Sequence, residues 1–172
     1  MSNASHIHVR PLEIADFAFV QALASRQANF TVPPLYVLWL MLRIKGAICL
    51  IAEHSSKGRL AYLLAVPING PEDSIFVWQL AALEGSARTK ATLALLAEFR
   101  NIVGELAVRS IVFSSVPNSA VFRAIRRYAW TVFSSVPETL NALPSAVNDK
   151  ESEFRLNLSG ICRSGGSQVA NR

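Results

Sequence analysis

The stretch Ser74–Leu96 reads SIFVWQLAALEGSARTKATLALL, and it decides the expected fold. Its first part, Ile75–Leu83, is an apolar run that contains a single glutamine, which is typical of a strand buried on both faces. A glycine and a serine then form a turn, and apolar residues return at helical spacing from Arg88 to about Leu106. Such a turn points backbone N–H groups away from the start of the helix, and this geometry suits a phosphate-bearing ligand.

Composition bounds the class of protein. A chain of 172 residues is long enough for one domain with a sizeable core, and 51% hydrophobic against 17% charged residues indicates a globular body. The net charge of +5 favours anionic ligands, although ordinary solvated faces produce the same excess. Aromatic residues lie inside apolar runs and do not alternate with basic residues, so we expect no nucleic-acid partner.

The cysteines and the apolar segments bear on compartment. Cys49 and Cys162 lie far apart, which indicates a reducing compartment and no metal cluster. Met1–Glu13 lacks the apolar core of a secretory signal, and the run Leu35–Leu42 is too short to span a bilayer. We therefore expect a cytoplasmic protein without a metal and without a membrane partner.

Two helices and three strands are expected before the central strand. A first strand over Ser5–Leu12 turns Ile7 and Val9 inward and its two histidines outward, and Asp16 is the expected N-cap of the next helix. The remaining segments are the helices Phe17–Gln27 and Leu35–Lys45 and a hairpin of the strands Ile48–His54 and Arg59–Pro67. Antiparallel strands followed by a strand–helix unit indicate an α+β sheet with helices packed on it.

Five segments are expected after the central helix. They are a strand at Val108–Val116, a helix at Ser119–Tyr128, a strand at Trp130–Ser135, a loop at Pro137–Lys150 and a last strand at Ser152–Leu158. Residues 159–172 show no apolar period and are expected to form a disordered tail. A single domain is therefore expected over residues 1–158.

Two patterns leave alternatives open. The helix Leu35–Lys45 is apolar almost all round, so it is expected to be buried, by default in the core and alternatively at a subunit contact or as an acyl-binding wall. Arg123, Arg126 and Arg127 share one side of a helix, where a solvated face is the simpler interpretation and contact with an anionic ligand is the sharper one.

The order of these elements resembles that of the GNAT superfamily of acyl-CoA-dependent N-acetyltransferases, from about His6 to Leu158. The sharpest likeness is to the diaminobutyrate acetyltransferases. The run Phe76–Ala81 resembles the FVWQVA of those enzymes, and Asn118 followed by Phe122-Arg123 resembles their Asn…Leu-Phe-Arg segment. The run Glu153–Leu156 resembles their closing Glu-x-Leu-(Tyr/Phe)-Arg-Ile.

The resemblance implies a mixed, mostly antiparallel sheet of about seven strands with helices on both faces, and acetyl-CoA as co-substrate. The central strand should diverge from the next strand, with the thioester's tail in the opening. A small primary amine would attack the thioester directly. The implied cofactor-binding residues are Leu80, Ala81, Ala82, Arg88, Thr89, Lys90, Ala91, Thr92, Asn118 and Arg123, and the implied substrate-binding residues are Tyr36, Trp78 and Glu153.

The sequence departs from the family pattern at three places. The family's loop pattern is Arg/Gln-x-x-Gly-x-Gly/Ala, and here Ala91 and Leu93 stand at the two small-residue positions. A Cβ atom at these positions narrows the space for a phosphate group. The positive charges of Arg88 and Lys90 partly offset this loss. Ile125 stands where many members carry a tyrosine acid, so the catalytic residues are unassigned. The stretch Asn29–Tyr36 lacks the acidic residue that a dicationic substrate needs, which makes diaminobutyrate a poor fit.

Two hypotheses follow from these observations. One is a divergent N-acetyltransferase acting on a small amine, in a chain that would form a homodimer as family members often do. The alternative is a non-catalytic GNAT-like interaction or regulatory module that has lost CoA binding, with the apolar helix Leu35–Ile44 as its contact surface. The missing loop glycines and Ile125 favour the second hypothesis, and the run Phe76–Ala81 favours the first.

Overall fold

A computed structural model describes residues 6–27, 30–68, 73–142 and 150–158 of the chain. The expected tail at 159–172, Cys162 and part of the expected loop at 137–150 lie outside these ranges. No helix of the described residues is long and apolar enough to cross a membrane.

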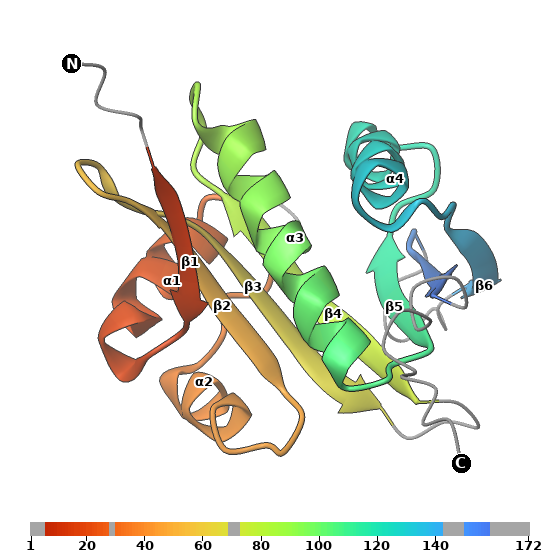
Figure 1. Ribbon diagram of the computed structural model, residues 1–172, viewed down its shortest axis with the longest axis horizontal. Coiled ribbons are helices and arrows are strands. Elements are labelled where there is room, and N and C mark those ends of the chain that lie inside the picture. The colour runs from red at the N-terminus through yellow and green to blue at the C-terminus, as the bar shows by residue number, and fades with distance from the viewer. Residues whose placement is uncertain (1–5, 28–29, 69–72, 143–149, 159–172) are drawn as a thin grey trace, which may run out of the picture.

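The chain folds into a seven-stranded sheet with the strand order β1-β2-β3-β4-β5-β7-β6 (Figure 1). Every neighbouring pair is antiparallel except β4 and β5, which run parallel. This confirms the expected α+β class and the mostly antiparallel sheet. The strands are β1 Ile7–Pro11, β2 Ile48–His54, β3 Gly58–Ile68, β4 Ser74–Ala82, β5 Ser110–Ser115, β6 Glu138–Ala142 and β7 Ser152–Asn157.

Helices cover both faces of the sheet. They are α1 Phe17–Ala24, α2 Leu35–Met41, α3 Arg88–Glu105 and α4 Ala120–Phe133, with a short 3-10 helix, η1, at Ile14–Asp16. On one face, Leu95 and Phe99 of α3 pack against β2 and β3 (Figure 1). On the other face, Val20 of α1 and Leu38 of α2 pack against Tyr62. The two apolar layers enclose β3 and β4, which explains their nearly continuous apolar sequences.

The expected strand at Trp130–Ser135 is wrong, because α4 continues to Phe133 and ends at Ser134 in the left-handed conformation with φ 53°. Phe133 packs edge-on against Phe99 of α3 with ring centroids 6.4 Å apart, and Ala129 lies buried on the same side. These contacts extend the helix past the residues whose local pattern favours a strand. Trp130 is left 62% exposed on the opposite side.

The expected loop at Pro137–Lys150 contains a strand, β6, at Glu138–Ala142. Its sequence, ETLNA, has little intrinsic strand preference. It becomes a strand because it pairs antiparallel with β7 along Glu138↔Arg155 to Ala142↔Ser152. A pairing of this kind depends on a partner far along the chain, which a local pattern does not report.

The second helix is shorter and less buried than expected. It ends at Met41, and only Leu38 and Met41 are buried, while Leu35 is 55% exposed and Tyr36 67% exposed. The helix lies on the sheet with one side only. Its apolar outer side is therefore open in this chain, and the expected burial all round is wrong.

Asp16 does not cap α1 through its side chain. It is fully buried and accepts hydrogen bonds from the Glu13 backbone N–H at 2.8 Å, from both terminal nitrogens of Arg10 at 2.7 and 2.9 Å, and from Nε of Arg59. Burial alone would raise the pKa of Asp16, but the hydrogen bonds from Arg10, from the Glu13 backbone and from Arg59 outweigh it and hold that pKa well below its ordinary value. This carboxylate ties β1, η1 and β3 together.

We expect Asp16→Asn to lower the free energy of unfolding by about 3 kcal/mol, because it leaves two guanidinium groups without their buried counter-charge. Urea denaturation at neutral pH measures the change. Since the pKa of Asp16 is depressed in the folded state, its contribution is present above the ordinary value of 3.8 and is lost as pH falls below that value.

The matched control is Glu53→Gln, since Glu53 is partly exposed and has one contact with Arg10 at 3.1 Å. This variant should lose less than about 1 kcal/mol. Equal losses for the two variants, or a loss in Asp16→Asn that does not shrink in acid, would contradict the assigned role of Asp16.

Candidate functional site

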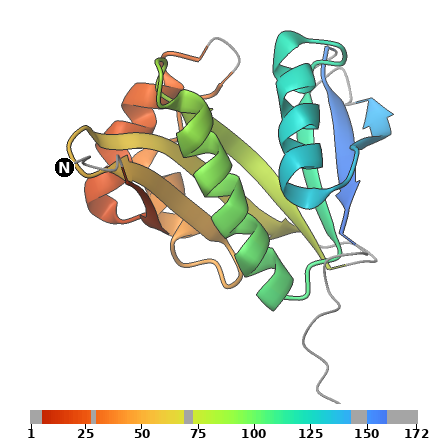
Figure 2. The same ribbon diagram turned by 45° about the horizontal axis from the view of Figure 1, so that its top comes forward.

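Strands β4 and β5 are paired over only part of their length. The ladder runs from Ser74↔Ser110 to Val77↔Phe113 and stops there, although β4 continues to Ala82. The last residues of β5 keep their pairing with β7 on the other side. Figures 1 and 2 show the two strands diverging beyond this point. The expected opening beside the central strand is thus present as a break in pairing, and β5 leaves one backbone edge of Trp78–Ala82 without a strand partner.

A β-bulge at Trp78 accounts for the divergence. Leu64 of β3 lies opposite Gln79, while the next residue, Ala65, lies opposite Val77, so Trp78 is an extra residue in β4. A bulge bends its strand and increases the local twist, and this one sits where the β5 ladder ends. It also turns two consecutive side chains to one face. Trp78 packs on the α1–α2 layer, and Gln79 bonds to a residue of that layer.

Gln79 joins the open strand to the segment between α1 and α2. Its Oε1 accepts a hydrogen bond from the Tyr62 hydroxyl at 2.8 Å, and its Nε2 donates to the Thr31 carbonyl at 2.7 Å. The side chain is 4% exposed, and burial raises the pKa of Tyr62, which keeps that hydroxyl protonated as a donor. Gln79 is absent from the candidate site residues drawn from the sequence. The available signal was its place as the one polar residue in an apolar strand, since a buried amide must find partners.

The start of α3 offers backbone donors. Gly85 has φ +124°, which favours glycine, and its carbonyl accepts the Arg88 N–H at 3.1 Å. The Ala91 N–H donates to the Ala87 carbonyl at 2.9 Å. Between them, the N–H groups of Thr89 and Lys90 have no hydrogen-bond partner within the described chain, and no side chain caps the helix. Two donors at a helix start, flanked by basic side chains, can hold an anion.

Ala91 and Thr92 face away from these donors. Ala91 is fully buried in the core below α3, and Thr92 is 7% exposed with its hydroxyl donating to the Arg88 carbonyl at 2.9 Å. The methyl group of Ala91 therefore fills the core and does not point into the anion-binding turn. The exposed members of the candidate set at this turn are Arg88, Thr89 and Lys90.

No protein-family model and no curated protein sequence matches this chain. Solved structures do match. Diaminobutyrate acetyltransferase EctA from Paenibacillus lautus, in complex with L-2,4-diaminobutyric acid and coenzyme A, aligns with a TM-score of 0.73 at 20% identity, over 90% of this chain and 96% of that one. The chain has the GNAT fold.

Two further structures agree with this assignment of the fold. An acetyltransferase attributed to the GNAT family from Desulfovibrio desulfuricans aligns with a TM-score of 0.67 at 18% identity, over 89% of this chain and 99% of that one. A point mutant of spermidine N-acetyltransferase SpeG from Vibrio cholerae aligns with a TM-score of 0.67 at 13% identity, over 90% of this chain and 95% of that one.

The candidate residues after β5 lie at the start of α4 in this GNAT fold. Asn118 has φ 61° and is exposed, and its carbonyl accepts a hydrogen bond from Nη1 of Arg123 at 2.7 Å. Ser119 caps the helix by accepting the Phe122 N–H at 3.0 Å. This turn follows the diverging end of β5, so Asn118 and Arg123 belong to the other side of the opening from β4.

The three substrate-binding candidates are placed on three different elements. Trp78 is on β4 and Glu153 is on β7, where it pairs with Ser114 of β5. Tyr36 is on α2, exposed, and stacked on Trp39 at 5.8 Å between ring centroids. The guanidinium of Arg43 covers the same Trp39 ring at 4.1 Å. Within the described ranges, no ring stacking or ion pair joins Tyr36 to Trp78 or Glu153.

Ile125 packs against an aromatic cluster of Phe113, Phe122 and Phe154, which also contacts Val77 at the last rung of the β4–β5 ladder. The position that carries a tyrosine in many GNAT proteins therefore lies close to the opening, but its side chain here has no proton to give. Tyr128, one turn further on, packs against the core on the α3 side.

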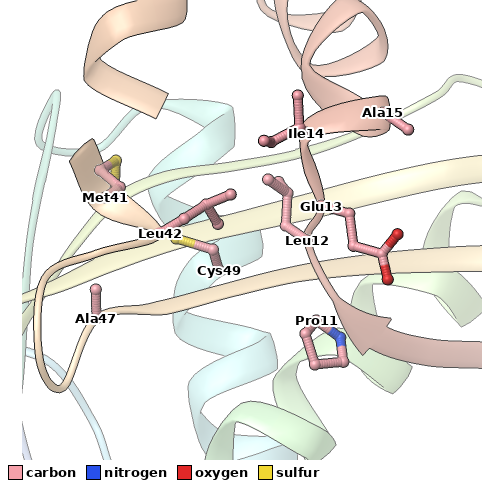
Figure 3. A pocket seen from close by; sticks show the side chains of 9 residues that line it. All are labelled: Pro11, Leu12, Glu13, Ile14, Ala15, Met41, Leu42, Ala47 and Cys49. Carbon is pink, nitrogen blue, oxygen red and sulfur yellow. The ribbon is translucent and has the colours of Figure 1, made fainter. Parts of the chain in front are cut away.

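A pocket of ≈ 610 Å³ lies away from this opening, between the end of α2 and the residues after β1 (Figure 3). Leu12, Ile14, Met41 and Leu42 give it apolar walls. Its one thiol is poorly reactive, because burial raises the pKa of Cys49 to about 11. Across the described ranges, no three histidine, cysteine or acidic side chains are grouped to hold a metal ion. The opening beside β4 is the better candidate site, because an unpaired strand edge there is followed in the chain by the backbone donors at the start of α3.

We expect Gln79→Leu to lower the free energy of unfolding by about 2 kcal/mol, because it leaves the buried Tyr62 hydroxyl and the Thr31 carbonyl without partners. The segment around Thr31 should also lose protection against amide hydrogen exchange. Tyr62→Phe is the control, since it breaks one of the two hydrogen bonds and keeps the link to Thr31. If Tyr62→Phe releases the Thr31 segment as fully as Gln79→Leu does, the linking role of Gln79 is wrong.

Proposed function

We propose that this protein is an N-acetyltransferase that transfers the acetyl group of acetyl-CoA to a small primary amine. The observation that carries the proposal is the unpaired backbone edge of β4 from Trp78 to Ala82, which is followed in the chain by the two unpaired N–H groups at the start of α3. A long ligand with amides in one part and phosphates in the next suits this order of groups.

The residues present suit the co-substrate. The pantetheine amides can form hydrogen bonds with the unpaired backbone edge of β4 near Leu80–Ala82, as an added strand would. The pyrophosphate can accept hydrogen bonds from the backbone N–H groups of Thr89 and Lys90, and the positive side chains of Arg88 and Lys90 lie in the same turn. The similar structure of EctA contains bound coenzyme A, which supports the proposal that this chain binds acetyl-CoA.

The reaction requires a neutral amine, an oriented thioester and a proton for the departing thiolate. The bulge at Trp78 and the two side-chain hydrogen bonds of Gln79 fix the position of the β4 edge. The fixed edge then orients the thioester carbonyl toward the amine. The apolar surroundings of Trp78 favour the neutral amine, because desolvation lowers an amine's pKa. The C–N bond forms as the C–S bond breaks, and the proton lost by the amine ends on the thiol. Ile125 at the tyrosine position has no proton to supply in this step.

The second candidate function is a non-catalytic interaction module. The exposed apolar residues of α2 and of the turn after it favour this function, because Leu35, Tyr36, Leu40 and Ile44 are each at least 36% exposed. We also propose that the chain forms a homodimer through this surface and that the protein is cytoplasmic.

Binding of acetyl-CoA separates the two functions. We expect calorimetry and thermal-shift measurements to show saturable binding, and Arg88→Glu and Lys90→Glu each to raise the Kd about tenfold by reversing charge beside the pyrophosphate. Arg100→Glu is the control, since Arg100 is exposed further along α3. Absence of both heat and thermal shift at millimolar acetyl-CoA would remove the transferase and leave the interaction module.

The assignment of Ile125 makes a gain-of-function prediction. Ile125→Tyr should raise kcat about tenfold, because it places a phenolic donor beside Val77 near the opening. Ile125→Phe tests the added bulk alone and should leave kcat within about a factor of two. Thiol release from acetyl-CoA measures both variants. An equal response of the two variants would show that this position does not face the departing thiol.

A further inference from the structure

Three arginines and one tryptophan share an exposed side of α4, the helix that lies over β5 and β7 (Figure 2). At about 100° per residue, Arg123, Arg126, Arg127 and Trp130 fall within roughly 100° of the helix circumference. All four are exposed, and the buried residues of the helix lie outside this sector. This basic side of α4 therefore presents three positive charges and one large ring that the core does not use.

The charges on the basic side of α4 are not compensated. The helix contains no acidic residue, and the side chains of Arg126 and Arg127 make no ion pair and no hydrogen bond within the described ranges. Arg123 donates only to the carbonyl of Asn118, and it lies three and four residues from the other two arginines, where like charges repel. A helix face that meets only solvent more often carries charges of both signs, so this surface complements an anionic partner.

The ring of Trp130 is uncovered. Within the described residues, no aromatic ring and no cation lies against it, although it is 62% exposed. Trp39 on α2 shows the contrast, because Tyr36 stacks on its ring and the guanidinium of Arg43 covers it at 4.1 Å. A flat group can therefore stack on Trp130, one helical turn from Arg126.

The combination of an uncovered ring and unpaired guanidinium groups favours one class of anionic partner. Single-stranded nucleic acid carries both a flat base and a phosphate in every unit, and proteins bind it by stacking bases on aromatic rings beside basic side chains. An acidic peptide supplies charge without a flat ring at each unit. A duplex supplies phosphates, but its bases are stacked on one another.

The structure also changes the premise of the expectation that no nucleic acid binds. That expectation rested on aromatic residues lying apart from basic ones, with Trp130 in a strand of its own. Because α4 continues to Phe133, Trp130 instead shares a helix with the three arginines.

We propose that the basic side of α4 binds single-stranded nucleic acid, with one base stacked on Trp130 and phosphates bound by Arg123, Arg126 and Arg127. These side chains contact backbone charge and the face of a base, so the binding does not depend on base sequence or on the sugar. The inference goes beyond the proposed transferase function and does not rest on it.

The test titrates the full chain into fluorescently labelled oligo(U) and follows the anisotropy at several salt concentrations. We expect saturable binding with a slope of log K against log salt of about −2, because each of three phosphate contacts contributes about −0.7. Arg126→Gln and Arg127→Gln should each reduce the size of the slope by about 0.7 and weaken binding about eightfold near 50 mM salt. Arg123 is left unchanged, because it is also a candidate cofactor-binding residue.

Trp130→Ala separates stacking from charge. It should weaken binding about tenfold and leave the salt slope unchanged, since the stacking of a base releases no counterion. Trp130→Phe keeps a ring and should restore most of the affinity. These side chains are exposed, so each variant should unfold at a temperature close to that of the wild-type protein.

Arg100→Gln is the matched control, because it changes the net charge by the same amount as Arg126→Gln but lies exposed on α3. It should leave the slope and the affinity for oligo(U) unchanged. An effect equal to that of Arg126→Gln would assign the binding to net charge alone and overturn the proposal. Absence of binding near about 50 mM salt would overturn it as well.

Two competitors of equal length identify the class of partner. Oligo(dT) should displace oligo(U) with an affinity within about threefold, since the sugar is not read. A polyglutamate peptide or duplex RNA that competes as well as oligo(dT) would assign the surface to an acidic protein or to a duplex, and either result overturns the proposal. The measurement needs neither acetyl-CoA nor an amine, so its outcome is independent of the transferase function.

Discussion

The end of the β4–β5 ladder at Val77 and Phe113 is the constraint on which the rest of the site depends. Backbone N–H and C=O groups inside a protein need partners, and a strand in the middle of a sheet normally finds them on both sides. Here β4 keeps its partner on the β3 side and loses it on the β5 side, because the extra residue Trp78 bends it away. The unpaired edge that results is made by the fold and not by any particular side chain.

Two buried polar side chains fix the structure around this edge. Gln79 connects β4 to Tyr62 and to the segment before α2, and Asp16 connects β1, η1 and β3 through two arginines. Each is expensive to bury unless its hydrogen bonds are complete, so each specifies one arrangement of the elements that it joins. Both lie on the side of the sheet that carries α1 and α2.

The turn before α3 differs in sequence from the GNAT loop pattern, yet its backbone still offers unpaired donors. Gly85 supplies the left-handed residue, and Thr89 and Lys90 present unpaired N–H groups. Ala91 belongs to the core under α3, so its methyl group contributes packing there. The chemistry of phosphate binding at a helix start depends on where the N–H groups point, and side chains beyond the first turn affect it little.

The sequence alone determined the order of most elements, the buried central strand and the two-sided covering of the sheet, because these follow from apolar periodicity along continuous segments. It also indicated the opening, through the likeness of Phe76–Ala81 to the GNAT pattern. It did not determine β6 or the last turns of α4, since the first depends on pairing with β7 and the second on Phe133 packing against Phe99. The hydrogen bonds of Gln79 to Tyr62 and Thr31 were equally out of reach. They join residues distant along the chain, and only the tertiary structure decides which polar groups meet.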